Sequence, residues 1–335
     1  MKKEFKIKIL AFVLFFSLNS YTEGEHKIFN LGNFDLESGV VLPNAKLSYV
    51  THGELNKEKD NLIFVPSAYL GDHHGFDFLI EPGKALDPNK YFIVATDMFQ
   101  NGLSSSPSNT PAPYDGPNFP LISIRDNVKA GHKLLTEEFG VKKIKSVVGF
   151  SMGAQQAFQW GVSYPYFVEK IVGIAGSAVE YPHGIVRLEG FIAAIKADQD
   201  FNKGQYTSPP EIGLRAGGAH WASWGWSQEW FRLGLYEEMG LNSTDEVIEW
   251  FEEFVLTWDA NNLIALARTW QNNNIGNTPG FEGDYTKALS SIKADVLYMP
   301  SETDMYFHID ALREEAKLIP GVKFRVIPSL SLIHI

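Results

Sequence analysis

The chain has 335 residues, of which 44% are hydrophobic and 13% aromatic, so it can bury a large core and is neither disordered nor collagen-like. It has no cysteine, which excludes a disulfide framework, a thiolate nucleophile and a zinc site with cysteine ligands. Its formal net charge of −11 and the lack of an evident basic patch argue against nucleic-acid binding.

Residues 1–20 are typical of a secretory signal peptide. A lysine-rich start precedes an uninterrupted apolar run at residues 9–16, and small or polar residues follow at 17–20. The apolar run is short for a membrane-spanning helix. We expect the segment to be cleaved, which leaves a secreted or periplasmic protein with no stable membrane insertion. An uncleaved anchor or a buried first helix is the alternative.

The remaining sequence alternates between strand-like and helix-like segments, which predicts an α/β fold with a mostly parallel sheet. Short apolar or alternating runs predict strands at residues 45–52, 62–65, 91–95, 146–149 and 170–174. Helical spacing predicts helices at residues 124–139 and 154–164. Residues 104–120 are rich in Ser, Pro, Asn and Gly and are therefore expected to form a long loop.

The pattern changes after residue 179. Residues 180–285 contain helical stretches, of which 245–258 and 260–271 are the clearest, and no convincing strand. Strands return at residues 296–299 and 323–327, with a helix at 309–318 between them. We therefore predict one α/β core, residues 21–179 and 286–335, interrupted by a helical cap, residues 180–285. The tryptophans concentrated in the cap either form an apolar lid over a pocket or pack its helices together.

The segment Gly149-Phe150-Ser151-Met152-Gly153 lies between a predicted strand and a predicted helix. This is the context of a nucleophile elbow, a sharp turn that exposes a serine hydroxyl to a base and a substrate. The two glycines are needed because side chains would clash in such a turn. Ser151 is therefore the candidate nucleophile.

A serine nucleophile of this type needs an acid and then a histidine later in the chain. Asp304 follows the strand at 296–299 and is the candidate acid; Glu302 is the alternative, and Asp304 could instead only cap a nearby helix. The histidine should follow the last strand. His334 is the candidate base, because His308 lies on the way into a helix and fits poorly.

The oxyanion of the reaction needs backbone N–H donors, and the best candidates belong to Tyr69 and Met152. Met152 follows the nucleophile, and Tyr69 lies in the loop after an earlier strand. The same loop continues into a His- and Asp-rich segment that could be interpreted as a metal site, made of Asp72, His73, His74 and Asp77. We favour a loop that lines the pocket, and we expect no metal and no cofactor.

At this level of detail the sequence resembles the homoserine O-acetyltransferase family of α/β-hydrolase proteins over roughly residues 40–330. The matching motifs are residues 68–74, 124–126, 149–153, 258–261 and 304–307. The resemblance implies the α/β-hydrolase fold, Ser151 as nucleophile, Asp304 as acid, and ping-pong acyl transfer through an acyl-serine.

The C-terminus departs from the family pattern. In the family, a Trp-Gly-His-type turn and a closing helix follow the last strand, whereas here the family's histidine column falls on Ile333, next to His334. We expect the last six or so residues not to be the native continuation. Residues 102–107 and the pair Gly153-Ala154 also differ, which argues against homoserine as the substrate.

These observations favour an exported ester hydrolase or deacylase acting on a small-molecule ester or thioester. Export would also separate the enzyme from acetyl-CoA and homoserine, which are cytoplasmic. An O-acyltransferase is the alternative, and a non-catalytic protein that keeps the fold as a binding module is a further one. A homodimer is possible.

Overall fold

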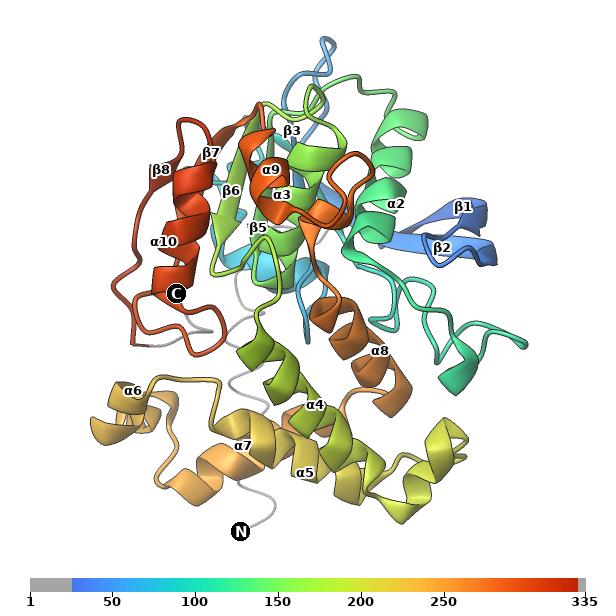
Figure 1. Cartoon of the computed structure of the whole chain (residues 1–335), viewed down its shortest axis with the longest axis vertical. Coiled ribbons are helices and arrows are strands. Elements are labelled where there is room, and N and C mark those ends of the chain that lie inside the picture. Colours follow the sequence, from blue (N-terminus) through green and yellow to red (C-terminus); the bar gives the residue numbers. More distant parts are fainter. Residues whose placement is uncertain (1–25, 331–335) are drawn as a thin grey trace.

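The computed structural model of the protein describes residues 26–330, and one eight-stranded sheet lies at its centre (Figure 1). The strand order is β1-β2-β4-β3-β5-β6-β7-β8. β1 (Lys27–Asp35) pairs antiparallel with β2 (Val41–His52), which pairs antiparallel with β4 (Phe92–Thr96). The other pairs are parallel and involve β3 (Leu62–Pro66), β5 (Ser146–Phe150), β6 (Lys170–Ile174), β7 (Asp295–Met299) and β8 (Lys323–Phe324). The predicted mostly parallel sheet is confirmed.

Both faces of the sheet are covered, as the fully buried strands β3 and β4 require. On one face lie α2 (Ile124–Glu137), α3 (Met152–Ser163) and α9 (Tyr285–Ser290), with α10 (Ile309–Leu318) beside α9 (Figure 1). The short helix η1 (His73–Leu79) and the residues after it bury a smaller apolar cluster on the other face. A capping box fixes the start of α2, because Ser123 and Asp126 each accept from the other's backbone N–H.

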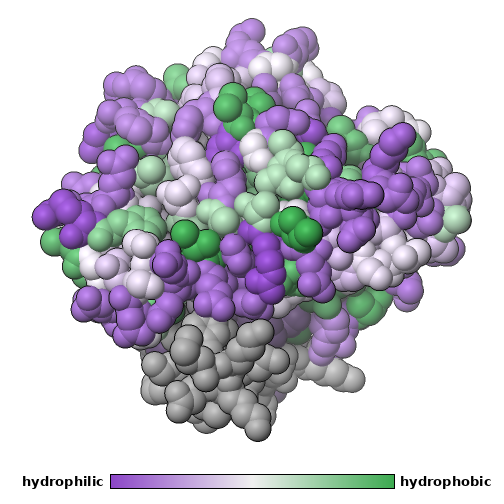
Figure 2. Space-filling view, turned by 90° about the horizontal axis from the view of Figure 1, so that it is seen from below, coloured by the Kyte–Doolittle hydropathy of each residue, from purple (hydrophilic) through white to green (hydrophobic). Residues whose placement is uncertain are grey.

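The helical cap joins the core between β6 and β7 and lies below the sheet in Figure 1. Its helices are α4 (Pro182–Lys196), α5 (Glu211–Ala222), α6 (Gln228–Arg232), α7 (Thr244–Leu256) and α8 (Ala260–Gln271). Seen from below, this side of the molecule is mostly hydrophilic, with hydrophobic residues in small separate areas (Figure 2). Within residues 180–285 no strand forms, and Trp226 and Asn274 make only isolated bridges.

Three expectations about the elements need correction. β1 was not predicted, because its mixture of polar residues and Gly32 hides the alternation of a half-exposed edge strand. The helix expected at 154–164 begins at Met152, directly after the elbow. The strand expected at 323–327 is only the short β8, and Ile327 makes just an isolated bridge to Ser301.

The segment interpreted as a signal peptide, residues 1–20, lies outside the described residues. So does His334. Among the helices of residues 26–330, none is both long and apolar enough to cross a membrane.

Candidate active site

The turn between β5 and α3 has the strained geometry of a nucleophile elbow. Ser151 has φ 54° and ψ −122°, a combination that ordinary residues avoid. A Cβ on Gly149 would lie 2.0 Å from the carbonyl oxygen of Gly153, and a Cβ on Gly153 would lie 2.7 Å from that of Pro66. Both glycines are therefore required by close backbone contacts, as the sequence predicts.

The two candidate oxyanion donors are held by the surrounding backbone. Met152 is the first residue of α3, where helix N–H groups have no partner within the helix. The loop carrying Tyr69 is fixed at Ser67, whose N–H donates to Thr96 at 2.9 Å and whose carbonyl accepts from Gln156 at 3.0 Å. Neither the Tyr69 nor the Met152 N–H donates to an acceptor among residues 26–330, so both are available to a substrate oxygen.

Ser151 and Asp304 line the same cavity of about 130 Å³. Its other walls are mostly aromatic and come from both the core and the cap: Tyr69, Phe150, Trp221, Trp250, Phe251, Phe254, Trp270 and Tyr306. Trp226 and Trp230 of the cap do not line it. They stack on each other instead, with ring centroids 4.3 Å apart. The cap tryptophans thus serve both of the roles considered from the sequence, wall of a pocket and helix packing.

Asp304 is 8% exposed, and its two carboxylate oxygens have different environments. Oδ1 accepts from the backbone N–H groups of Tyr306 and Phe307, both at 2.8 Å. These bonds close a turn ahead of α10, whose N-cap is His308, so Asp304 does not cap that helix as the alternative supposed. Oδ2 is buried and has no hydrogen-bond partner among the described residues. Burial raises the pKa of Asp304 to about 7. Oδ2 is therefore free to accept from a histidine N–H, whereas Glu302 is exposed and absent from the cavity wall.

A buried cation, Arg187 of α4, lies behind the aromatic wall and was not predicted from the sequence. Its guanidinium carbon lies 4.4 Å from the ring centroid of Tyr306 and 4.9 Å from those of Trp221 and Trp270. None of its three side-chain nitrogens has an acceptor among the described residues. Its charge holds the pKa of Asp304 down against the effect of burial. Nothing in the sequence marks Arg187 as buried, because α4 carries other polar residues, including Glu189 two positions later.

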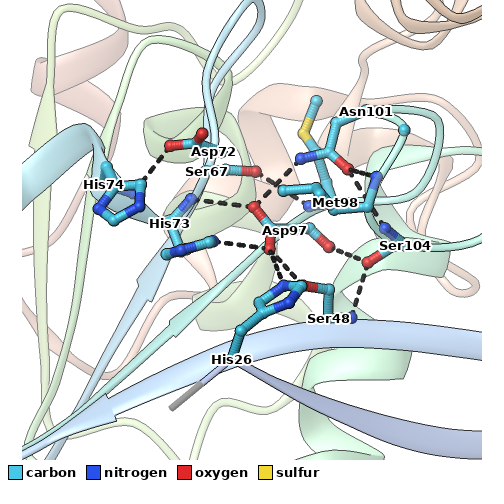
Figure 3. Close-up of polar contacts among 12 residues, drawn as sticks. His26, Ser48, Ser67, Asp72, His73, His74, Asp97, Met98, Asn101 and Ser104 are labelled. Carbon is cyan, nitrogen blue, oxygen red and sulfur yellow. Dashed lines mark hydrogen bonds and ion pairs between the residues drawn. The ribbon is translucent and has the colours of Figure 1, made fainter. Parts of the chain in front are cut away.

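Asp72, His73, His74 and Asp77, interpreted alternatively as a metal site, do not form a group of possible metal ligands in the part of the chain that the structure describes. His73 and His74 turn to different carboxylates. Nδ1 of His73 lies 2.9 Å from Oδ2 of Asp97 (Figure 3). Nδ1 of His74 lies 2.7 Å from Oδ2 of Asp77. His26 joins His73 and Asp97 instead, and the three donor atoms lie within 4.8 Å of one another.

Hydrogen bonds to Asp97 explain why His26, His73 and Asp97 lie close together. Asp97 is fully buried, and its Oδ1 accepts from the His73 N–H at 2.9 Å and from Asn101 at 3.1 Å (Figure 3). Its Oδ2 accepts from Ser48 as well as facing His73. The carboxylate thus ties the segment after the Tyr69 loop to β2 and to the end of β4. Tyr69 and Leu70 of this loop line the Ser151 cavity, whereas residues 72–77 do not.

Other histidines do not complete the site within the described residues. His308 is 73% exposed, lies 4.0 Å from Asp310 and is absent from the cavity wall. The candidate base His334 lies outside the described residues, and its role remains a prediction.

Comparison with known proteins identifies relatives of this chain. A family model described as "alpha/beta hydrolase fold" matches residues 61–329. An ethyl acetate hydrolase of Pseudomonas veronii is 39% identical over 321 residues, covering 93% of this chain and 91% of that protein. A homoserine O-acetyltransferase of Leptospira biflexa is 32% identical over 299 residues, covering 81% of this chain and 78% of that protein.

Solved structures agree with the sequence matches. The acetyl esterase MekB superposes with a TM-score of 0.90 at 38% identity, covering 92% of each chain. An acetylester hydrolase from Corynebacterium glutamicum superposes with a TM-score of 0.89 at 35% identity, covering 92% of this chain and 90% of that one.

Proposed function

The chain belongs to the α/β-hydrolase family, and from this premise we propose that it is a serine esterase that hydrolyses acetyl and similarly short esters of small alcohols. The fold and the resemblance to homoserine O-acetyltransferases that the sequence predicts are both confirmed, although the relatives include esterases as well. These relatives are enzymes, which disfavours a purely binding role for the fold.

The proposed reaction proceeds through an acyl-serine. Ser151 Oγ attacks the ester carbonyl while a histidine takes its proton, and the N–H groups of Tyr69 and Met152 stabilise the charge on the carbonyl oxygen. The alcohol leaves with the proton, and water then attacks the acyl group and releases the acid. Asp304 Oδ2 accepts from the histidine and orients it. His334 is our candidate for this base.

The small cavity is the observation that carries the choice of a short acyl group. A volume of about 130 Å³, lined by Ser151 and mostly by aromatic rings, leaves little room for a long acyl chain. The names of the relatives support the same choice, since both the ethyl acetate hydrolase and the acetyl esterase act on acetyl esters by name.

Water rather than an alcohol is the proposed acceptor. Esterase relatives match over nine-tenths of this chain: the ethyl acetate hydrolase at 39% identity and a probable esterase of Corynebacterium glutamicum at 36%. A homoserine O-acetyltransferase that is 40% identical matches only 55% of the chain, and the one that matches 81% of it is 32% identical. The difference is modest, so O-acyl transfer is the second candidate and the assay must separate the two.

The test compares p-nitrophenyl acetate, butyrate and octanoate, each with and without added homoserine or a simple alcohol. We expect hydrolysis of acetate to exceed that of octanoate by about 100-fold, no gain from the acceptor, and no activity in Ser151→Ala. An ester product that forms only with the acceptor would replace the esterase with the transferase. Equal rates for acetate and octanoate would refute the short-acyl assignment.

We also propose that the enzyme acts outside the cytoplasm, on the basis of residues 1–20. The test is fractionation of cells that express the full chain or residues 21–335. The full chain should be exported and shortened near residue 20, and a full chain retained at its full mass in the cytoplasm would refute export. A homodimer likewise stays a prediction, which sedimentation measures.

A further inference from the structure

A second cavity, of about 530 Å³, lies on the opposite side of α8 from the Ser151 cavity, and the two share no lining residue. On α8, Ile264, Ala265 and Arg268 line the second cavity, whereas Trp270 lines the first. The volume falls in the range of about 300–1,000 Å³ that small-molecule pockets occupy. The esterase mechanism uses none of its residues.

The walls of this cavity are apolar and its charges are all positive. Phe119, Leu121 and Ile264 supply apolar surface from the long loop and from α8. The charged lining residues are Lys196, Lys203 and Arg268. Arg268 is paired with Glu189, but neither lysine lies within ion-pair distance of a carboxylate of the described residues. The cavity therefore favours an anion that carries an apolar body.

Gln100 also forms part of the wall. It is 1% exposed, and its side-chain amide meets the Thr269 hydroxyl at 2.7 Å, which joins the residues after β4 to α8.

We propose that this second cavity binds a small carboxylate with an apolar body, separately from the ester substrate. The aromatic and aliphatic walls contact the body, and Lys196 and Lys203 attract the carboxylate.

The experiment is calorimetric titration of the full chain with three probes that share one body: octanoate, 1-octanol and octylamine. Octanoate should bind in a saturable way, about tenfold more tightly than 1-octanol, and octylamine more weakly still. Replacing both lysines, Lys196→Gln with Lys203→Gln, should weaken octanoate binding about fivefold and reduce its dependence on salt. Lys293→Gln, at an exposed lysine outside the cavity, should leave binding unchanged.

A pair of matched substitutions locates the site. Ile264→Trp fills the second cavity and should abolish octanoate binding, while p-nitrophenyl acetate hydrolysis persists. Ile212→Trp, at a 74% exposed position of α5, controls for the added indole. Octanoate binding that survives Ile264→Trp would place the ligand elsewhere and overturn the proposal. Equal affinity for octanoate and 1-octanol would overturn the carboxylate assignment, and so would the absence of saturable binding.

Discussion

The Tyr69 hydroxyl donates to the carbonyl oxygen of Leu263 at 3.0 Å, which joins the loop of a proposed oxyanion donor to α8 of the cap. The Tyr69 ring also stacks on Trp221, with centroids 5.1 Å apart. The position of the Tyr69 N–H thus depends on the cap. We expect Tyr69→Phe to lower the free energy of unfolding by about 1 kcal/mol and to lower kcat more than it raises KM. Steady-state kinetics with denaturant unfolding checks this, and an unchanged kcat would show that the tether does not position the loop.

We expect substitution of an elbow glycine to lower the activity. Gly149→Ala places a methyl group against the Gly153 backbone, so the turn must shift and Ser151 must move with it. A displacement of about 1 Å costs about 100-fold in rate, and we expect at least this loss in kcat/KM for p-nitrophenyl acetate. Gly75→Ala is the control, because its Cβ meets nothing within 4 Å. A fully active Gly149→Ala enzyme would contradict the strained elbow.

We expect the charge of Arg187 to affect how kcat/KM depends on pH. Its charge lowers the pKa of Asp304, which burial raises to about 7, and Asp304 must be ionised to orient the histidine. Arg187→Met should therefore move the acidic limb of kcat/KM to higher pH by about one unit, so the variant loses most activity at low pH and least at high pH. Arg232→Met, at a 66% exposed side chain, should leave the limb in place. An equal loss at every pH would indicate only a packing role.

We expect the buried Glu315 to make the free energy of unfolding depend on pH. Its oxygens accept from the Ala178 N–H and from the hydroxyls of Tyr181 and Tyr298, and burial raises its pKa from 4.5 to about 7. Because the folded state holds this proton more tightly, its stabilisation is complete below about pH 4.5 and is lost as pH rises through about 7. Glu315 alone should lower the free energy of unfolding by about 3 kcal/mol over this range, and Asp304 and Glu180, whose pKa values burial also raises, add to the fall. The fall in Glu315→Gln should therefore be about 3 kcal/mol smaller than in the wild type.

Denaturant unfolding at about pH 5 and about pH 8 measures this difference. Glu314→Gln is the neighbouring control, since its side chain is 71% exposed, and it should keep the wild-type slope. Identical slopes for Glu315→Gln and the wild type would show that Glu315 does not set the pH dependence.

The sheet and the elbow could be predicted from sequence because their signals are local. Runs such as residues 62–65 must be buried strands, and Gly149-Phe150-Ser151-Met152-Gly153 needs its two glycines for backbone reasons that adjacent residues reveal. β1 escaped detection because an edge strand with one exposed face tolerates polar residues. The short β8 shows the opposite error, since an alternating run at 323–327 pairs only where β7 reaches it.

The surroundings of the site were not predictable because they depend on long-range contacts. Arg187 meets Trp221, Trp270 and Tyr306 only once the cap has folded onto the core. The partner of His73 is Asp97, at the end of another strand, rather than the neighbouring Asp72 that the sequence places beside it. Asp304 could be predicted because it follows the end of a strand. That its Oδ2 has no hydrogen-bond partner among the described residues is visible only in the fold.

The central claim, that Ser151 forms the acyl-enzyme, is tested most directly by trapping that intermediate. The full chain is mixed with p-nitrophenyl acetate, quenched in acid within the first turnover and mapped by peptide mass spectrometry. The account predicts one acetyl group on the peptide that contains Ser151, and no acetylation or hydrolysis in Ser151→Ala. Hydrolysis that persists in Ser151→Ala, or an acetyl group found on another residue during turnover, would contradict it.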